Sequence, residues 1–241
     1  MYFKKKIICV VTARSGSKGL KNKNLLKLGH KSLVSWSLSA AKNSKYVDEV
    51  YLSTDSNLIM NEAKKLNLKT RKLRPKYLSS DNTKSIDVLL NVLNQLENIN
   101  EIYDYVLLLE PTSPFTESKD IDNSIKKLIK NKNATSLVSI QENITYHPIF
   151  NFKINKNNLI QSYARNYKIT RRQDLNKLYY LDGSIYISKI SSLKKIKNFY
   201  HSKTTFIILD DYKSIEIDNY MDLLCARTIY KNLSKINKNE K

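Results

Sequence analysis

Short apolar runs alternate with helix-patterned stretches along most of this chain, and no other feature constrains its fold as strongly. Runs with the length and apolar content of buried strands cover residues 6–12, 50–53, 105–109 and 134–140. Apolar residues recur at helical spacing between them, over residues 31–42, 58–66, 85–96 and 119–129. Strands that alternate with helices predict an α/β fold with a doubly wound, mainly parallel sheet and right-handed crossovers.

The alternation lapses over residues 142–181, where the chain is polar and rich in Asn, Lys, Arg and Tyr. This segment is too long for a structureless connection, so we expect a hairpin-like excursion that covers the site or meets another subunit. Beyond it, we expect strands at residues 184–188 and 205–209 and a closing helix at 220–233. The sequence therefore predicts one domain over residues 1–233, excursion included, and a frayed tail over residues 234–241.

The composition of the chain argues against export and against a membrane span. No apolar run approaches the ~18 residues that a membrane span needs. The basic and apolar start resembles a short signal peptide, but a basic loop follows it where a cleavage site would be needed. Cys9 and Cys225 are better explained as reduced thiols than as a disulfide framework. We therefore expect a cytoplasmic protein with no membrane partner.

Lysine and arginine outnumber the acidic residues by 42 to 22, which gives a formal net charge of +20. Such a charge could attract nucleic acid through its phosphates, or anionic small molecules such as a triphosphate and a sugar acid. It could also reflect a lysine-rich background spread over solvated helix faces. The lysines are dispersed along the whole chain, so background is the preferred explanation and a nucleic-acid partner is not expected.

The loop after the first expected strand has the composition of a phosphate-binding loop. It matches neither the Walker A motif nor the G-x-G-x-x-G fingerprint, because its glycines are spaced differently. Gly16 and Gly19 nevertheless allow a tight turn in which backbone N–H groups approach phosphate oxygens. Arg14, Lys18 and Lys23 can neutralise a triphosphate. An ordinary surface turn is the alternative, and the place of the loop directly after a strand disfavours it.

A pair of carboxylates stands just before the last expected helix. If residues 215–218 form a strand, Glu216 and Asp218 point to one face while Ile215 and Ile217 face the core. Two such carboxylates suit Mg²⁺, which binds one or two carboxylates together with phosphates and water. Without other support, the same pair could be no more than the solvated face of a strand.

Several short motifs, in a fixed order over roughly residues 6–230, resemble those of one enzyme family. The first are A-R-S-G-S-K-G-L-x-x-K-N at residues 13–24 and S-T-D at 53–55. The others are L-R-P at 73–75, L-S-S-D at 78–81, L-E-P-T-S-P at 109–114, D-G-S-I-Y-I at 182–187 and I-E-I-D at 215–218. Each motif alone is weak, but by the ordered set the chain is identified as a member of the acylneuraminate cytidylyltransferase (CMP-sialic acid synthetase) family.

This resemblance implies a Rossmann-like nucleotidyltransferase fold and a homodimer in which the excursion reaches the partner subunit. It implies attack by the anomeric hydroxyl of an acidic nine-carbon sugar on the α-phosphate of CTP, with Mg²⁺ and loss of pyrophosphate. The implied catalytic residues are Arg14, Lys23 and Asp218, and the implied Mg²⁺ ligands are Asp218 and Glu216. The implied nucleotide-binding residues are Ala13, Arg14, Ser15, Lys18, Lys23, Asn24, Ser80 and Asp81. The implied sugar-binding residues are Glu110, Thr112, Ser113, Arg172, Gln173 and Asp182.

The chain departs from the sialic acid enzymes where those relatives recognise the sugar. Glu110 replaces their usual Gln, Thr116 stands where Arg is common, and Tyr180-Leu181 replace Arg-Pro. We expect Glu110 either to accept a hydrogen bond from a substrate amide or hydroxyl, or to form a structural ion pair with Arg14 or a lysine. Glu216 stands where relatives carry Asp, so either it binds the metal through water or the loop has shifted. These departures favour a bacterial sugar such as legionaminic or pseudaminic acid over N-acetylneuraminate.

Two other functions compete with this prediction. The loop and the carboxylate pair would also serve a nucleotidyltransferase that uses another nucleotide or a Kdo-like sugar acid. The high positive charge could instead mark an RNA-binding protein on an inactive enzyme scaffold. That function predicts an altered loop and aromatic stacking platforms in a basic groove, whereas the loop is intact and the 16 tyrosines show no such arrangement.

Overall fold

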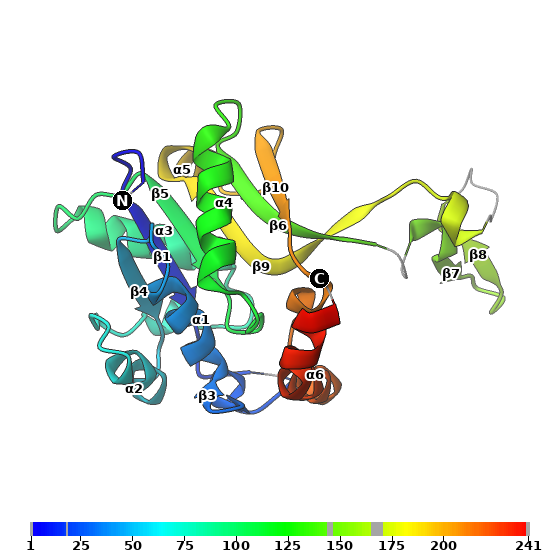
Figure 1. Ribbon diagram of the computed structural model, residues 1–241, viewed down its shortest axis with the longest axis horizontal. Coiled ribbons are helices and arrows are strands. Elements are labelled where there is room, and N and C mark those ends of the chain that lie inside the picture. Colours follow the sequence, from blue (N-terminus) through cyan, green and yellow to red (C-terminus); the bar gives the residue numbers. More distant parts are fainter. Residues whose placement is uncertain (1, 18, 144–146, 165–170, 240–241) are drawn as a thin grey trace.

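The computed structural model describes residues 2–17, 19–143, 147–164 and 171–239, and its centre is a six-stranded sheet (Figure 1). The strands are β1 (Ile7–Thr12), β4 (Glu49–Ser53), β5 (Tyr105–Leu109), β6 (Ser136–Glu142), β9 (Tyr179–Lys189) and β10 (Thr204–Ile208). They lie in the order β10-β6-β9-β5-β1-β4. β1 pairs in parallel with β4 and β5, and β10 with β6, whereas β9 runs antiparallel to β5 and β6. The predicted mainly parallel α/β sheet is therefore confirmed, with one antiparallel strand inserted.

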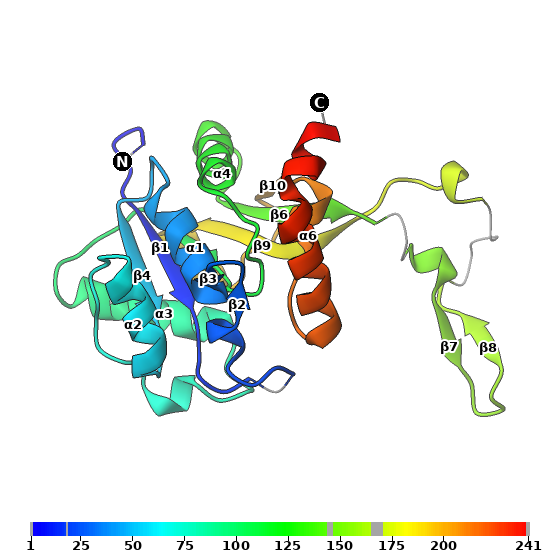
Figure 2. The ribbon, with the colours of Figure 1, turned by 60° about the horizontal axis from the view of Figure 1, so that its bottom comes forward.

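Helices cover both faces of this sheet (Figures 1 and 2). They are α1 (Leu33–Lys42), α2 (Asn57–Lys65), α3 (Ser85–Glu97), α4 (Ser118–Lys130), α5 (Ile190–Ile196) and α6 (Tyr220–Asn239). On β1, Ile7, Cys9 and Val11 pack with α1, α2 and α4, while Ile8 and Val10 pack with α3 and α5. Because both faces of β1 are buried, its sequence is a continuous apolar run. Among the described residues, none of the helices has the length and apolar character that a membrane crossing requires.

The last helix, α6, packs beside a small hairpin formed by β2 (Lys27–Leu28) and β3 (Lys31–Ser32). A third buried cluster joins α6 to the start of α1 and to the segment before α6; its members are Leu28, Leu33, Phe115, Ile217, Leu223 and Ala226. Gly29 turns the hairpin at a φ of +60°, and a Cβ there would lie 2.1 Å from the ring of Tyr230, so glycine is required. This packing fixes the segment that carries Glu216 and Asp218 against the domain.

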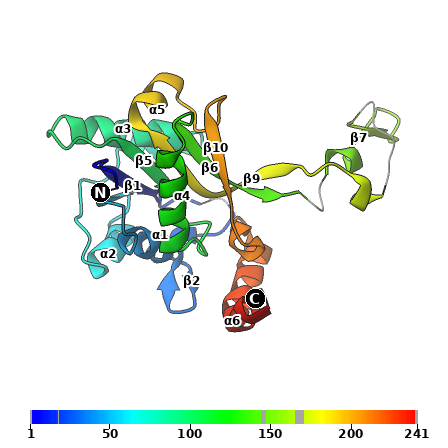
Figure 3. The same cartoon turned by 45° about the horizontal axis from the view of Figure 1, so that its top comes forward.

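Part of the range 142–181 projects from the body as an arm (Figures 1 to 3). β6 and β9 continue beyond the sheet as a ribbon, in which Gln141 pairs with Tyr180 and Glu142 with Tyr179. Beyond the ribbon lie two 3₁₀ turns, η3 (Pro148–Phe150) and η4 (Arg172–Asp174), and a hairpin of β7 (Phe152–Ile154) and β8 (Ile160–Ser162). The polar stretch in which the α/β alternation lapses thus builds a separate hairpin at the end of a ribbon.

Several element boundaries differ from the sequence prediction. β9 begins at Tyr179, before the expected strand, because its first residues belong to the ribbon. The sequence did not predict α5, whose 7 residues are too few to show a helical period. The final helix extends to Asn239, so residues 234–239 are helical where a frayed tail was expected, and residues 240–241 lie outside the described part. Residues 215–218 belong to no described strand, so the strand expected there is wrong.

Candidate functional site

A polar cleft of about 490 Å³ opens at the carboxyl ends of β1 and β5. In open parallel sheets, ligands bind at this edge because the loops that leave the strands enclose space there. Most of the residues that the sequence predicts for the site line this cleft. They are Arg14, Lys23, Asn24, Ser80, Asp81, Glu110, Thr112, Glu216 and Asp218.

The loop over residues 13–24 is held in shape by hydrogen bonds that do not use its cationic groups. The N–H of Ala13 donates to a β4 carbonyl at 3.0 Å, which extends the pairing of β1 with β4. Ser15 donates to both carboxylate oxygens of Asp55, at 2.7 Å from its N–H and 2.9 Å from its hydroxyl. Asn24 closes the loop, because its Nδ2 donates to the Arg14 carbonyl at 2.9 Å. Ala13 and Ser15 therefore shape the loop and do not line the cleft.

Gly19 brings this loop against the segment that carries Asp218. A Cβ added at Gly19 would lie 2.3 Å from the carbonyl oxygen of Asp218, closer than side chains come to backbone. Glycine is therefore needed because two backbones approach each other here. Lys18, the preceding residue, lies outside the described residues, so its contact with the nucleotide stays a prediction.

Two cationic side chains of the loop pair with carboxylates of the cleft. Arg14 Nη2 lies 2.6 Å from Asp81 Oδ1, and Lys23 Nζ lies 2.9 Å from Asp218 Oδ1. Both pairs are partly exposed, so each contributes about 1 kcal/mol or less to the free energy of folding. Such weak pairs exchange readily for a triphosphate, which offers several anionic oxygens to the same donors.

Arg74 is a cleft residue that the sequence prediction missed. Its side chain lines the cleft at 8% exposure, and Nε and Nη2 find no hydrogen-bond partner within the described residues. Burial lowers the pKa of its guanidinium; Asp55 opposes this shift and Arg14 adds to it. Buried donors without acceptors are costly, so this guanidinium is suited to acceptor atoms of a ligand. The L-R-P motif at residues 73–75 was the sequence signal that could have identified it.

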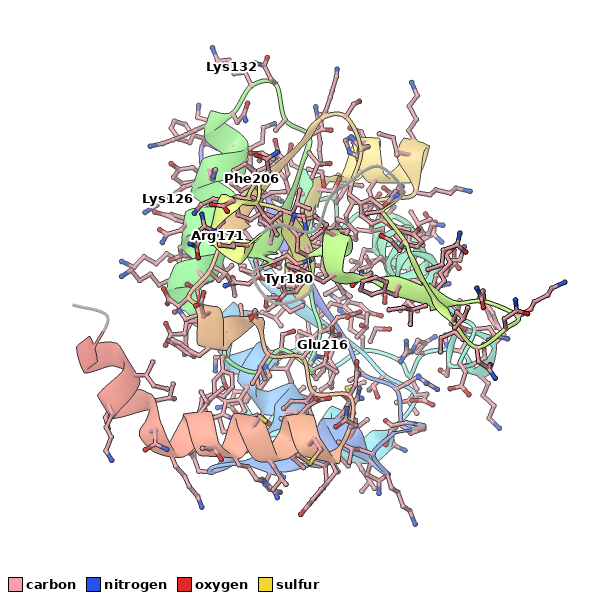
Figure 4. All side chains as sticks on the ribbon, turned by 90° about the vertical axis from the view of Figure 1, so that its right-hand side faces the viewer. Lys126, Lys132, Arg171, Tyr180, Phe206 and Glu216 are labelled. Carbon is pink, nitrogen blue, oxygen red and sulfur yellow. The ribbon has the colours of Figure 1, made fainter. Side chains whose placement is uncertain are left out.

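Glu216 and Asp218 both line the cleft, as the alternation of residues 215–218 predicts, although the segment is not a strand. Ile217 between them is fully buried, and its N–H donates to the Thr112 carbonyl at 2.9 Å. The Glu216 carboxylate packs on Gly183, where an added Cβ would lie 3.2 Å from Oε2. Burial raises the pKa of Glu216, and the charges of Asp218 and Glu110 raise it further. Figure 4 shows Glu216 between α6 and the sheet.

The two carboxylates fit Mg²⁺. Their oxygens are the hard ligands that this ion takes from proteins, and their mutual repulsion favours a cation between them. Within the described residues, no group of three or more His, Cys, Asp and Glu side chains could enclose a metal by itself. Phosphate oxygens and water would therefore complete the coordination.

Glu110 lies at the end of β5 and is partly buried in the cleft. Its Oε1 accepts a hydrogen bond from the Ser85 hydroxyl at 2.9 Å. Burial raises the pKa of Glu110, while the Ser85 hydrogen bond and the charge of Lys23 lower it. Among the described contacts, Arg14 pairs with Asp81 and Lys23 with Asp218, and Glu110 forms no ion pair with either. The structural ion pair, one of two alternatives for Glu110, is therefore not observed.

Four of the residues predicted to bind the sugar lie elsewhere. Ser113 is 2% exposed and does not line the cleft. Asp182 is also 2% exposed; the Ser139 hydroxyl and the Ser184 N–H both donate to its Oδ1, so it is a sheet residue. Its position on β9 turns the carboxylate toward β6 rather than into the cleft. Arg172 and Gln173 belong to η4 on the arm, remote from the cleft of their own chain (Figure 1).

The positive charge of the chain is not concentrated in the cleft. The described lining residues include three cations, namely Arg14, Lys23 and Arg74, against the four carboxylates of Asp81, Glu110, Glu216 and Asp218. Lys126, on α4 with its ammonium over the Tyr46 ring, and the exposed Lys132, just after α4, both lie away from Glu216 (Figure 4). The net charge of +20 therefore lies outside the described lining of the cleft.

Comparison with known proteins identifies the family of this chain. A family model described as cytidylyltransferase matches residues 8–236, nearly the whole chain. The chain belongs to the cytidylyltransferase family. The resemblance found in the ordered motifs is thereby confirmed, and the described loop, carboxylate pair and Glu110 all lie within the matched range.

The relatives of this cytidylyltransferase include enzymes named for different sugar acids. The chain is 30% identical over 227 residues to a pseudaminic acid cytidylyltransferase of Campylobacter jejuni, across 94% of this chain and 97% of the relative. It is 32% identical over 225 residues to a CMP-N,N'-diacetyllegionaminic acid synthase of Legionella pneumophila, across 90% and 93%. It is 32% identical over 222 residues to an N-acylneuraminate cytidylyltransferase of Streptococcus agalactiae, across 91% and 52%.

Solved structures share the fold of the chain. A CMP:2-keto-3-deoxy-manno-octonic acid synthetase complexed with CTP superposes with a TM-score of 0.68 at 16% identity, across 94% of this chain and 99% of the other. A 4-diphosphocytidyl-2C-methyl-D-erythritol synthase from Anaerococcus prevotii superposes with a TM-score of 0.64 at 14% identity, across 94% and 99%. The Rossmann-like nucleotidyltransferase fold is thereby confirmed.

Proposed function

We propose that this cytidylyltransferase joins CMP from CTP to an acidic nine-carbon sugar and releases pyrophosphate. The observation that carries the proposal is a single cleft with a cationic loop on one side and the Glu216–Asp218 carboxylates on the other. Such a cleft can hold a triphosphate and a divalent cation together. The choice of CTP as nucleotide and of the class of sugar rests on the names of the relatives.

The reaction is an in-line displacement at the α-phosphorus. A bond forms between the anomeric oxygen of the sugar and this phosphorus, the proton of the anomeric hydroxyl passes to solvent, and the bond to the bridging oxygen of pyrophosphate breaks. Positioning and charge neutralisation dominate the catalysis of such transfers. Arg14 and Lys23 exchange their carboxylate partners for phosphate oxygens and stabilise the charge on the leaving pyrophosphate. Bound Mg²⁺ would supply further neutralisation and lower the pKa of the sugar hydroxyl, held by Asp218 directly and by Glu216 directly or through water.

The nucleoside end of the cleft lies near Arg74, Ser80 and Asn24. The unpartnered Nε and Nη2 donors of Arg74 suit the ring acceptors of a pyrimidine. The Ser80 hydroxyl is within hydrogen-bond distance of Thr83, at 2.8 Å, and can also face a ribose or base. This arrangement favours a base with acceptors at its edge, as cytosine has.

The sugar end of the cleft contains Glu110 and Thr112. Glu110 is fixed by Ser85 through Oε1, so Oε2 remains to accept a hydrogen bond from an amide or hydroxyl of the sugar. A carboxylate at this position suits a sugar that offers an additional N–H donor, whereas it would repel an anionic group of the sugar. Legionaminic and pseudaminic acids, each with two acylamino groups, are therefore the preferred candidates over N-acetylneuraminate.

A homodimer formed through the arm would complete the site. The arm carries large apolar side chains that its own chain leaves exposed: Phe152, Ile154, Leu159, Ile160, Tyr163, Leu178, Tyr179, Tyr180 and Leu181. Exposed apolar surface of this extent is typical of an interaction site. A second copy would cover it and bring Gln173 and Arg172 toward the neighbouring cleft. Sedimentation velocity tests this: Ile160→Lys should shift a dimer toward monomer, and a monomeric native chain would contradict it.

Pyrophosphate release from CTP, measured with a panel of nonulosonic acids with and without Mg²⁺, tests the function. We expect turnover that needs Mg²⁺, and loss of about 10² to 10³ in turnover for Arg14→Ala with the fold retained. Equal turnover with UTP would indicate another nucleotide, and activity with Kdo alone another sugar acid. CTP binding without turnover of any sugar would refute the substrate class. As a biosynthetic enzyme that consumes CTP, the protein is proposed to act in the cytoplasm.

A further inference from the structure

Lys213 is a buried lysine that lies outside the cleft and has no role in the proposed reaction. It is 3% exposed, although lysine is almost never buried without carboxylate partners. Its Nζ lies 3.0 Å from Asp120, 3.1 Å from Glu117 and 3.2 Å from Asp210. Burial lowers the pKa of Lys213, but Asp120 and Glu117 outweigh burial and hold this pKa above its usual range. The ammonium is therefore a fixed positive charge among three carboxylates.

Two of the three partners of Lys213, Glu117 and Asp120, belong to the N-terminus of α4, whereas Asp210 lies on the lysine's own segment. Glu117 and Asp120 form a capping box there, in which the Glu117 N–H donates to Asp120 Oδ2 at 2.9 Å. The cleft loop that contains Thr112 leads directly into this helix end. The partial positive charge of a helix N-terminus disfavours a nearby cation. The Glu117 and Asp120 carboxylates offset this repulsion and allow the Lys213 ammonium to lie there. Lys213 thus joins the end of one cleft loop to the segment that begins at Asp210.

The same segment is attached at further points to the loop before α4 and to β9. The ring of Tyr212 meets the ring of Phe115 edge-on at 5.9 Å, and the Ser184 hydroxyl donates to the Lys213 carbonyl at 3.3 Å. Three residues after Lys213, the chain reaches Glu216, and the next N–H, that of Ile217, donates to Thr112. Among these attachments, the Lys213 ammonium is the one that carries charge and is fully enclosed.

We propose that Lys213 is a positioning residue, which sets the placement of Glu216 and Asp218 by binding their segment to the N-terminus of α4. The metal-binding consequence rests on the proposed function, in which these carboxylates hold Mg²⁺. Without the ammonium, three carboxylates repel one another at the junction, and the segment separates from the helix end. The two cleft carboxylates then lose their fixed separation, which Mg²⁺ with its strict geometry requires.

The test compares Lys213→Met with Lys194→Met, a matched lysine that pairs with Glu97 at 2.5 Å away from the cleft. Mn²⁺ affinity of the full chain with CTP bound, measured by electron paramagnetic resonance, should fall about tenfold in Lys213→Met, as for other residues that orient metal ligands. Affinity for CTP without metal should be retained. Hydrogen exchange at the Ile217 amide, measured without metal, should accelerate in Lys213→Met and not in Lys194→Met.

If Lys213→Met fails to fold, Lys213→Met combined with Asp120→Asn removes a buried charge pair and allows the same measurements. A lower melting temperature with unchanged Mn²⁺ affinity and unchanged Ile217 exchange would overturn the proposal, since Lys213 would then stabilise the fold without positioning the carboxylates. Wild-type Mn²⁺ binding that is insensitive to Asp218→Asn would refute the metal site instead. In that case the metal-free exchange result still decides whether Lys213 positions the segment.

Discussion

The ammonium of Lys23 lies 2.9 Å from a carboxylate oxygen of Asp218. The two residues have different partners in the proposed complex, a phosphate for Lys23 and Mg²⁺ for Asp218. Their contact therefore places a protein cation on the proposed metal ligand. In the proposed complex, Mg²⁺ and CTP would supply both new partners at once, so the two ligands together would favour separation of the Lys23–Asp218 pair.

Lys23→Met should remove a competitor of the metal. Without nucleotide, we expect this variant to bind Mn²⁺ more tightly than wild type, because Asp218 no longer has an ammonium partner. Turnover should fall about 10² to 10³-fold, since a phosphate donor is lost. Electron paramagnetic resonance of Mn²⁺ measures the first effect and pyrophosphate release the second. Lys27→Met, at an exposed position of β2, is the control. Weaker Mn²⁺ binding in Lys23→Met than in wild type would contradict the idea that Lys23 competes with the metal for Asp218.

Arg74→Met should weaken recognition of the base. We expect KM for CTP to rise about tenfold or more, which corresponds to about 1.4 kcal/mol, because hydrogen-bond donors to the ligand are lost. Discrimination between CTP and UTP should decrease as well. Arg71→Met is the matched control, since Arg71 pairs with Glu49 and Glu101 outside the cleft. An unchanged ratio of kcat/KM for CTP and UTP would show that Arg74 does not read the base.

Gly19→Ala should move the loop away from Asp218. The new Cβ would meet the Asp218 carbonyl at 2.3 Å, so one of the two backbones must shift. A displacement of this kind costs about 10²-fold in turnover when it separates groups that act together. Steady-state kinetics measure the loss, with Lys21→Ala in the same loop as control. If Gly19→Ala retained full turnover, the close approach of the two segments would have no catalytic importance.

Glu110→Gln should change the pH dependence of stability in the ligand-free protein. In the folded protein, the pKa of Glu110 is raised above its ordinary 4.5. As the pH rises from 4.5 through this raised pKa, the carboxyl ionises more readily in the unfolded chain than in the folded one, so the folded state loses stability. The variant should therefore be more stable than wild type at neutral pH, and this difference should diminish as the pH falls toward 4.5. Thermal unfolding at several pH values measures it. Glu101→Gln should behave oppositely, because hydrogen bonds from Arg71 and Lys69 lower the pKa of Glu101.

The same Glu110→Gln variant should alter the preference among sugars. If Oε2 accepts a hydrogen bond from an N–H of the substrate, the amide should reduce kcat/KM most for the sugar that supplies this donor. A loss of about tenfold relative to other sugars is expected for one hydrogen bond to a charged acceptor. Competition assays with pairs of nonulosonic acids measure the ranking. An unchanged ranking would remove Glu110 from the recognition of the sugar.

The sequence predicted the sheet well because continuous apolar runs mark strands that are buried on both faces. The run at 105–109 coincides with β5, and the pattern at 85–96 nearly coincides with α3. Short elements were missed or misplaced because their patterns are brief. α5 has too few residues for a period, and residues 215–218 alternate as a strand would while lacking a pairing partner strand.

The candidate site was predicted best where the backbone itself forms the cleft. The loop around Arg14 and the segment around Asp218 come together at the expected edge of the sheet. Asp182 lies outside the described lining of the cleft, which its motif could not indicate, because a motif gives the order of side chains along β9 and not the face to which the local irregularity between β6 and β9 turns them. Arg74 was missed because its importance lies in its burial and lack of partners, and neither property is visible in a sequence.

β9 reaches from the ribbon of the arm to the centre of the sheet, and Gly183 on it has a φ of +77° and lies beside the Glu216 carboxylate. The pairing of β9 with β6 shifts its register between Val138 and Ile140, and such an irregularity bends a strand. The direction in which the arm leaves the sheet is therefore set close to Glu216, on a strand that also belongs to the central sheet.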